Sequence, residues 1–233
     1  MAAALSIAVP SKGRLKDQVA DLFDRAGAPL RKTGHERGYR GALDGIGGVE
    51  VEFASAAEIV HLLRTGRVHL GITGEDLIRE TLTDVDRAVE FLVPLGIGRA
   101  DVVVAVPDCW IDVASMADLE DVAAQFARAH GRRLRVATKY MNLTRRFFAE
   151  HGVAGYRIVE SAGATEATPA SGTAELIVDI TTTGTTLRAN HLKVLDDGLI
   201  LKSQSHLFAA RAVQWTPQAV AIRDAIAARL SSQ

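Results

Sequence analysis

The residues best suited to chemistry follow a short apolar run at residues 176–178. Asp179 ends this run, and a turn rich in threonine precedes a segment that resumes as a helix at Leu187. Such a turn can aim successive backbone N–H groups at an anion, and the start of the helix adds further unpaired donors. Its hydroxyl groups and its glycine belong to Thr182, Thr183, Gly184, Thr185 and Thr186. The pattern predicts a phosphate-binding turn.

Asp179 indicates what is attached to the phosphate. A carboxylate repels a phosphate, so its natural use here is to accept hydrogen bonds from the hydroxyl groups of a sugar. One strand end would then bind a ribose 5-phosphate. The alternative is an ordinary capped loop, because threonine is a favourable N-cap residue. The acid at the end of the strand and the hydroxyl groups on both sides of Gly184 favour the phosphate site. No Gly-Lys-Ser/Thr follows, which excludes a Walker A loop.

Two further corners between a strand and a helix carry polar residues. The first follows a strand at residues 5–9 and is strongly basic, which suits a polyphosphate; a solvated basic loop is the alternative. The second follows a strand at residues 68–73. Between them, residues 31–48 are rich in glycine and basic residues and predict a loop or β-ribbon. The candidates are Ser11, Lys12, Gly13 and Arg14 in the first corner, Thr73, Gly74 and Glu75 in the second, and Arg37 and Arg40 in the ribbon.

Composition restricts the possible functions of the chain. It has 233 residues, 48% of them hydrophobic, and a formal net charge of −1, which indicates a soluble globular protein with no electrostatic attraction to nucleic acid or membranes. Cys109 is the only cysteine, which excludes intrachain disulfides and cysteine-based zinc sites. The seven histidines show no metal-binding spacing, so no protein metal site is expected. The N-terminus does not resemble a signal peptide, and a cytoplasmic protein is expected.

The order of the predicted elements indicates the fold class. Strands alternate with helices almost throughout, which is typical of α/β proteins with parallel sheets, and such sheets bind ligands beyond the carboxyl ends of their strands. The apolar run at residues 101–106 predicts a strand covered on both faces. Residues 192–204 read as strands around a turn at Asp197 and Gly198, and residues 205–230 as mostly helical. Several polar strand ends favour a phosphorylated small molecule as the ligand.

The motifs together resemble a known family, the short form of ATP phosphoribosyltransferase, which opens histidine biosynthesis. The matching segments lie in order over nearly the whole chain, at residues 10–15, 70–77, 135–145, 163–169 and 172–190. The resemblance implies two α/β lobes of the type II periplasmic-binding-protein kind with a cleft between them. Lobe one would comprise residues 1–93 and 185–233, and lobe two, residues 94–184, would carry the loop for phosphoribosyl pyrophosphate.

The resemblance also implies a reaction. N1 of the adenine ring of ATP attacks C1 of phosphoribosyl pyrophosphate, which gives N1-(5-phosphoribosyl)-ATP and releases pyrophosphate. Mg²⁺ is required and is carried mainly by the substrate phosphates. Little acid–base chemistry is needed, because adenine N1 already offers a lone pair. The protein has to hold two polyanions in line and to stabilise the charge that builds on the leaving pyrophosphate.

The family's roles pass to matching residues of this chain. Arg14 is the first choice for the leaving pyrophosphate, with Lys12 beside it and an arginine of the ribbon, Arg37 or Arg40, as a further contact. Asp179 would bind the ribose hydroxyls and the threonine turn the 5-phosphate. Glu160 is a further candidate on this side, with a surface carboxylate as the alternative. The ATP side is assigned to Ser11, Gly13, Thr73, Gly74 and Glu75.

One departure from the family and one implied partner remain. Many family members carry Arg-Ala-x-Asp-Ile-Pro where this chain reads Ser-Ala-Ala-Glu-Ile-Val at residues 55–60, so a basic contact from that helix start is in doubt. The short forms work with a regulatory subunit that resembles the catalytic core of histidyl-tRNA synthetase. The resemblance therefore implies a hetero-octamer that receives histidine feedback through that subunit.

Two other functions stay open on the sequence. A non-catalytic binding or effector-sensing module can have the same two-lobed fold, although a receptor would need a signal peptide and a regulator an attached DNA-binding domain. A purine-salvage phosphoribosyltransferase also has a strand, an acid and a Thr-Gly-x-Thr loop. Those enzymes usually carry two adjacent acids, whereas Ile180 follows Asp179 here.

Overall fold

The structure is a computed structural model that describes residues 3–33 and 39–232. Its contacts divide the chain into two units, Met1–Arg99 with Gln204–Gln233, and Ala100–Ser203. Each unit contains one β-sheet. Among the described helices, none combines the length and apolar character that crossing a bilayer requires.

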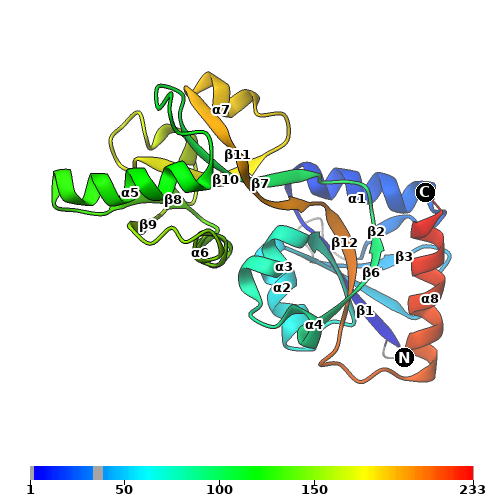
Figure 1. Cartoon of the computed structure of the whole chain (residues 1–233). Helices are drawn as coiled ribbons and strands as arrows, with labels where there is room; N and C mark the ends of the chain where they lie inside the picture. Colours follow the sequence, from blue (N-terminus) through cyan, green and yellow to red (C-terminus); the bar gives the residue numbers. More distant parts are fainter. Residues whose placement is uncertain (1–2, 34–38, 233) are drawn as a thin grey trace. The chain divides into compact units, whose positions relative to one another are not determined.

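A seven-stranded sheet forms the centre of the first unit (Figure 1). Its order is β2-β3-β4-β1-β5-β12-β6, with β1 parallel to β4 and β5 and with β12 antiparallel to β5 and β6. The strands are β1 (Leu5–Pro10), β2 (Leu30–Lys32), β3 (Arg40–Leu43), β4 (Val49–Ala54), β5 (Leu70–Gly74), β6 (Val89–Pro94) and β12 (Ser205–Ala210). The helices are α1 (Gly13–Arg25), α2 (Ala56–Arg64), α3 (Glu75–Thr81), α4 (Val85–Ala88) and α8 (Pro217–Ser231).

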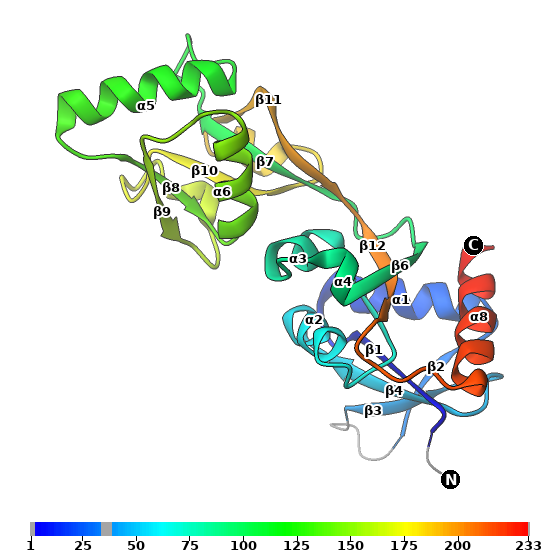
Figure 2. The ribbon, with the colours of Figure 1, turned by 60° about the horizontal axis from the view of Figure 1, so that its bottom comes forward.

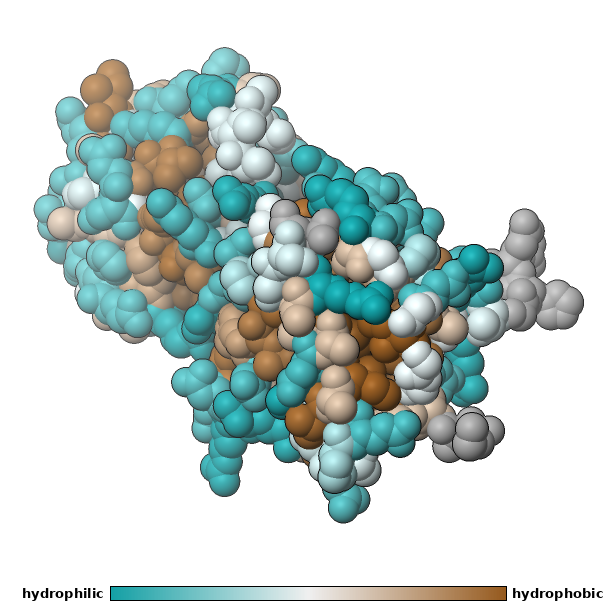
Figure 3. All heavy atoms as spheres, turned by 90° about the vertical axis from the view of Figure 1, so that its right-hand side faces the viewer, coloured by the Kyte–Doolittle hydropathy of each residue, from teal (hydrophilic) through white to brown (hydrophobic). Residues whose placement is uncertain are grey.

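Helices cover both faces of this sheet, as the two views of the ribbon show (Figures 1 and 2). Ile7 of β1 belongs to a core cluster with residues of α1 and α8, whereas the next residue, Ala8, packs into a second cluster with α2, α3 and β12. This alternation follows from the two-residue repeat of a strand. Figure 3 looks at the side on which α8 lies and shows hydrophobic side chains among hydrophilic ones.

The second unit has a five-stranded sheet of order β11-β7-β10-β8-β9. Here β7 runs antiparallel to both of its neighbours, whereas β10, β8 and β9 are parallel. Helices α5 and α6 pack on one face, and Leu187 of α7 packs on the other. The elements are β7 (Ala100–Pro107), α5 (Met116–His130), β8 (Leu134–Thr138), α6 (Met141–Glu150), β9 (Tyr156–Glu160), a 3₁₀ turn η1 (Thr165–Ala167), β10 (Leu176–Thr181), α7 (Thr185–Ala189) and β11 (Leu192–Ser203).

Two predicted elements are corrected by the structure. The expected turn at Asp197 and Gly198 is wrong, because β11 passes through both residues with shifts in its register against β7. The carboxylate of Asp197 instead accepts a hydrogen bond of 2.8 Å from the backbone N–H of Met116 at the start of α5. Residues 205–210 are not helical but form β12, all six residues of which are buried. A strand buried on both faces shows no alternation of apolar and polar residues. Its sequence therefore cannot be distinguished by periodicity from that of a buried helix.

The boundaries between the units also differ from the expected lobes. Residues 185–203 lie in the second unit, because β11 pairs along most of its length with β7. Residues 94–99 lie in the first unit, where the chain leaves β6. The chain passes between the units after Arg99 and again after Ser203.

Candidate functional site

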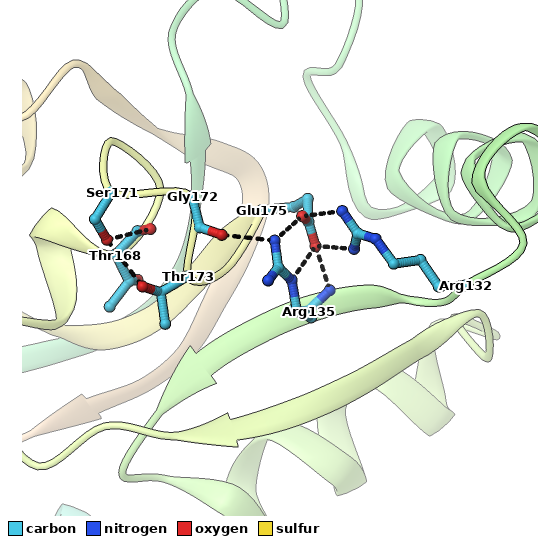
Figure 4. A network of polar contacts seen from close by, with 7 residues as sticks. All are labelled: Arg132, Arg135, Thr168, Ser171, Gly172, Thr173 and Glu175. Atoms are coloured by element: carbon cyan, nitrogen blue, oxygen red, sulfur yellow. Dashed lines mark hydrogen bonds and ion pairs between the residues drawn. The ribbon is translucent and has the colours of Figure 1, made fainter.

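The start of β10, the strand that carries Asp179, is held by a charged network (Figure 4). The Glu175 carboxylate accepts hydrogen bonds from the guanidinium groups of Arg135, at 2.6 Å, and Arg132, at 3.0 Å. Arg135 also donates to the carbonyl of Gly172, which ties the preceding loop to β8. Burial by itself raises the pKa of Glu175, but the hydrogen bonds from Arg135 and Arg132 outweigh it and lower this pKa to about 2. The network therefore contains an ionised carboxylate.

Asp179 lies two residues before the end of β10, opposite Val103 of β7. Its Oδ1 accepts a hydrogen bond of 2.8 Å from the backbone N–H of Ile180, and its side chain is half-buried. Burial raises the pKa of Asp179, and the charge of Glu166 adds to this rise, while the Ile180 N–H and the charge of Lys139 oppose it. The carboxylate can therefore gain from further hydrogen-bond donors that a ligand would bring.

The threonine turn after β10 is built by its own hydrogen bonds. The hydroxyl of Thr181 accepts from the backbone N–H of Gly184 at 2.9 Å, and the hydroxyls of Thr183 and Thr185 lie 2.9 Å apart. Gly184 has a φ of +69°, a conformation that favours glycine, and a Cβ there would lie 2.9 Å from Nη1 of Arg188. The threonines at positions 182, 183, 185 and 186 are exposed. The predicted phosphate-binding residues thus stand together on one surface turn.

Two cations near these residues lie within the matching segments at residues 135–145 and 172–190 but have no predicted role. The guanidinium group of Arg188 donates to the Thr183 carbonyl at 3.1 Å and to the Thr185 hydroxyl at 3.3 Å. Lys139 directly follows β8, the parallel neighbour of β10. The spacing of Arg188, four residues after Gly184, was the available signal, since residues three and four apart meet on a helix. Nothing local marks Lys139, because the pairing of β8 with β10 is long-range.

The structure separates Glu160 from Asp179. Glu160 ends β9, and β8 lies between β9 and β10, so the two strands are about 10 Å apart at two inter-strand spacings. The side chain of Glu160 is exposed. Glu166 is the acid whose charge acts on Asp179. A role for Glu160 remains a prediction that this arrangement does not favour.

The basic corner of the first unit follows β1. The backbone N–H of Ser11 donates to the carbonyl of Ala54 at 2.9 Å, which joins the ends of β1 and β4. Lys12, Gly13 and Arg14 are exposed at the start of α1, whose first turn holds no acidic residue. The end of β4 continues into α2, which Ser55 caps by accepting a hydrogen bond of 3.3 Å from the N–H of Glu58. Where many family members carry an arginine, this chain therefore has a capping hydroxyl.

The corner after β5 combines a buried hydroxyl with an ion pair. Thr73 is fully buried, and among the described residues its hydroxyl has no hydrogen-bond partner. The Glu75 carboxylate forms an ion pair of 2.6 Å with Arg79 and lies 4.0 Å from His206. Gly74 is the N-cap of α3. Within the described residues the buried Thr73 hydroxyl thus lacks a hydrogen-bond partner, whereas Glu75 already has a charged one.

Of the two arginines predicted in the ribbon, the structure describes only Arg40. Arg40 begins β3, is exposed, and forms an ion pair of 3.2 Å with Glu50 of β4. Arg37 lies outside the described residues. Their predicted contact with pyrophosphate or with the ATP phosphates remains a prediction.

In each sheet, most of the candidate residues lie at the carboxyl ends of the parallel strands. In the first unit, the parallel pairing of β4, β1 and β5 brings the corners at residues 11–14 and 73–75 to the carboxyl ends of neighbouring strands. In the second, Asp179, the threonine turn and Lys139 lie where the parallel strands β10 and β8 end. Within the described ranges, no group of three or more His, Cys, Asp or Glu side chains is placed to hold a metal ion.

Comparisons with known proteins identify the family of the chain. The chain matches the HisG family, ATP phosphoribosyltransferase, over residues 55–232. It is 61% identical over 213 residues to an ATP phosphoribosyltransferase of Afipia carboxidovorans, and this match covers 91% of the chain and 66% of the relative. The chain thus spans about two thirds of the length of that curated relative.

Two solved structures show the same fold. The chain is similar to one from the ATP phosphoribosyl transferase (HisG:HisZ) complex of Thermotoga maritima, with a TM-score of 0.72 and 23% identity over 98% of this chain and all of that one. An ancestral arginine-binding protein bound to arginine gives a TM-score of 0.54 at 13% identity, over 100% of this chain and 92% of that one. The predicted fold class, a two-lobed α/β protein of the periplasmic-binding-protein type, is confirmed. With a family match over about three quarters of its length, the chain belongs to the ATP phosphoribosyltransferase family.

Proposed function

We propose that the protein is an ATP phosphoribosyltransferase acting at the first step of histidine biosynthesis. A bond forms between N1 of adenine and C1 of the ribose of phosphoribosyl pyrophosphate. The bond from C1 to the pyrophosphate oxygen breaks, and pyrophosphate leaves with that electron pair. The observation that carries the proposal is the exposed threonine turn beside the half-buried Asp179, in a chain that belongs to this family.

The second unit would bind the phosphorylated ribose. Asp179 accepts hydrogen bonds from the ribose hydroxyls. These replace hydrogen bonds from water that the carboxylate loses through burial. The backbone N–H groups and hydroxyls of the turn at residues 182–186 bind the 5-phosphate, with Arg188 as an added cation close to the turn. The charge of Lys139 opposes the rise in the pKa of Asp179 and thus favours the ionised carboxylate.

The first unit would bind the leaving pyrophosphate and ATP. Lys12 and Arg14, exposed at the start of α1, stabilise the negative charge that develops on the departing pyrophosphate. Arg40, or Arg37 outside the described residues, adds a further contact. Ser11, Gly13, Thr73, Gly74 and Glu75 line the ATP side. Support for Thr73 comes from its buried and unpartnered hydroxyl, and Glu75 would act together with its partner Arg79.

Mg²⁺ would be bound mainly by the phosphates of the two substrates. This ion keeps octahedral oxygen coordination and is usually held by one or two carboxylates together with substrate phosphates. Asp179, beside a turn of hydroxyl groups, offers one such carboxylate, which fits an ion that the phosphates carry. When bound, Mg²⁺ neutralises charge on the pyrophosphate.

The chain would act as a short-form catalytic subunit in the cytoplasm. It would assemble with a regulatory subunit that resembles the catalytic core of histidyl-tRNA synthetase, as a hetero-octamer. Support comes from the HisG:HisZ complex that supplies the Thermotoga maritima structure. Co-expression with such a subunit, followed by measurement of the mass of the purified complex, tests the assembly.

The activity is tested by incubating the chain with ATP, phosphoribosyl pyrophosphate and Mg²⁺, with and without the regulatory subunit. Mass spectrometry should detect ATP carrying one added phosphoribosyl group, together with a change in ultraviolet absorbance. Mixtures without phosphoribosyl pyrophosphate serve as the control and should give no adduct. Absence of the adduct in both complete mixtures would contradict the proposal. Turnover with guanine or hypoxanthine in place of ATP would indicate the purine-salvage reaction instead.

A further inference from the structure

Three arginines from different elements of the first unit surround one hollow. Arg64 is the last residue of α2, Arg87 lies in α4, and Arg211 directly follows β12. All three are exposed. The hollow has a volume of about 310 Å³ and is lined by these arginines together with Asp84, Ala88 and Ala212. None of these residues belongs to the predicted substrate corners.

Backbone contacts hold the three elements together. The N–H of Arg211 donates to the carbonyl of Ala88 at 3.0 Å, which fixes the end of β12 against α4. Gly66, two residues after Arg64, has a φ of +65°, and a Cβ there would lie 2.8 Å from the carbonyl oxygen of Ala212. The chain after α2 therefore approaches the chain after β12 as closely as a glycine allows. These backbone contacts bring together the three segments that carry the arginines.

The charges around the hollow are not balanced. Other described arginines of this unit form ion pairs with carboxylates, among them Arg31, Arg40, Arg79 and Arg223. The three arginines of the hollow form none within the described part of the chain. Nη2 of Arg64 lies 3.4 Å from Nδ1 of His61, which is not a carboxylate. Asp84 lies at the rim, where its Oδ1 accepts a hydrogen bond of 3.2 Å from the N–H of Arg87. The four charged side chains carry a net charge of about +2 at neutral pH.

Topology places the hollow away from the predicted substrate corners. Residues 11–14 follow the carboxyl end of β1, and residues 73–75 lie at the carboxyl end of β5. Helix α2 returns the chain to the amino-terminal end of β5, and β12 ends at that same edge, because the N–H of Ala210 donates to the carbonyl of His69. The hollow thus lies near the amino-terminal end of β5, opposite to the strand ends that carry the predicted substrate corners.

We propose that this hollow binds a small phosphate dianion, either inorganic phosphate or a phosphate monoester. Guanidinium groups bind phosphate oxygens with paired hydrogen bonds, and three arginines line this hollow. A phosphate monoester carries a charge of about −1.5 to −2 at pH 7, which matches the net charge of the hollow. Its volume lies at the lower end of the range for ligand pockets, which is about 300–1,000 Å³, so the ligand is small.

The test is a titration of the ¹⁵N-labelled full chain with inorganic phosphate, at constant ionic strength, followed by NMR. Saturable shifts are expected for amides at residues 64–66, 84–88 and 211–213. Arg87→Ala and Arg211→Ala should each weaken this binding about tenfold, because each removes one charge-assisted pair. Arg128→Ala, which removes an exposed arginine from α5 in the other unit, should leave it unchanged.

Two comparisons separate this site from the proposed substrate site. Amides at residues 181–186 report phosphate at the threonine turn, and their shifts should be the same in all three variants. Succinate, a dianion without phosphate geometry, should bind the hollow more weakly than phosphate does. Absence of saturable shifts around the hollow would overturn the proposal, as would equal binding in the arginine variants or equal binding of succinate. A ribose 5-phosphate arm tests the monoester, which should produce the same shifts.

Discussion

Asp179 is the residue whose environment most directly links the fold to the proposed chemistry. Burial raises its pKa, and Lys139 with the Ile180 N–H offsets this only in part. Because the folded-state pKa of this acid is raised, the ionised form costs stability. That cost is absent below the unfolded pKa, grows as the pH rises through the folded pKa, and stays constant above it. A substrate that donates hydrogen bonds would recover this free energy on binding.

We therefore expect Asp179→Asn to have opposite effects on stability and activity. The amide keeps an acceptor for the Ile180 N–H but carries no charge, so the Tm of the free protein should rise at pH 7 and the gain should shrink at acidic pH. The apparent affinity for phosphoribosyl pyrophosphate should fall at least tenfold, since hydrogen bonds to a charged group contribute about 1.5–3 kcal/mol. Thermal unfolding at several pH values and steady-state kinetics measure the two effects.

The matched control is Asp121→Asn, which changes an exposed aspartate on α5 of the same unit. Neither Tm nor kinetics should respond to it. The ribose role of Asp179 would be refuted by an Asn variant that uses phosphoribosyl pyrophosphate normally, or by one that loses affinity for ATP equally.

At the residue scale, the sequence predicted those parts of the candidate site whose residues are close together in the chain. The threonine turn and the acid before it stand within eight residues, and their neighbours in space are their neighbours in the chain. The hydroxyl of Thr181, which closes the turn onto Gly184, was not singled out, because a threonine inside the strand reads as an ordinary strand residue. Lys139 reaches the surroundings of Asp179 only through the pairing of β8 with β10. A sequence of one protein does not reveal such a pairing.

At the element scale, the ion-pair network around Glu175 fixes the start of the strand that ends in the proposed site. Its carboxylate is held by Arg132 and Arg135, and its pKa is lowered to about 2 from an ordinary value of 4.5. An acid whose pKa is lower in the folded than in the unfolded state stabilises the fold at pH values above its unfolded-state pKa. This stability is lost as the pH falls toward the folded-state pKa. The network therefore stabilises β10 and the loop before it at neutral pH.

Replacing the carboxylate by an amide tests this contribution. Glu175→Gln should destabilise the chain at pH 7 by about 1–3 kcal/mol, because it leaves Arg135 without its charged partner. The difference from the unchanged protein should decrease below about pH 4.5 and vanish near pH 2, the range in which the unchanged protein loses the interaction. Urea unfolding at pH 7 and pH 3 measures it. Glu150→Gln, an exposed glutamate on α6, is the control, and an equal loss of stability at both pH values would contradict the electrostatic explanation.

Elements with one clear periodicity were predictable, whereas those buried on both faces or irregular were not. The amphipathic helix α5 and the apolar strand β7 correspond to runs that the sequence marks plainly. In β12 every residue is buried, so its pattern lacks the alternation that distinguishes a strand. In β11 an Asp-Gly pair, typical of a tight turn, instead occupies an irregular stretch of the strand. There the hydrogen bond that Asp197 accepts from the N–H of Met116 in α5 is a tertiary contact, and local preference does not reveal it.

At the scale of the whole molecule, the division into units depends on pairing between distant segments. Family resemblance indicated one unit made from both ends of the chain, but the position of residues 185–203 follows from the pairing of β11 with β7. The proposed function assigns the phosphorylated ribose to the second unit and the leaving pyrophosphate to the first. Two ligands that differ only in the pyrophosphate can therefore be used to test each assignment.

Hydrogen exchange measured by mass spectrometry should separate the two roles. Ribose 5-phosphate lacks the pyrophosphate. Apart from the separate hollow lined by Arg64, Arg87 and Arg211, it should protect backbone amides at residues 179–188 but not at residues 11–14, because within the proposed substrate site only the threonine turn and Asp179 have groups for it to bind. Phosphoribosyl pyrophosphate with Mg²⁺ should add protection at residues 11–14, where Lys12 and Arg14 are exposed to solvent in the free protein. In Lys12→Ala and Arg14→Ala this added protection should weaken while that of the turn remains, since the 5-phosphate contacts are unchanged. Protection of residues 11–14 by ribose 5-phosphate itself would show that the cations bind the sugar phosphate rather than the leaving group. If phosphoribosyl pyrophosphate gave no protection there, the corner after β1 would have no part in stabilising the departing charge.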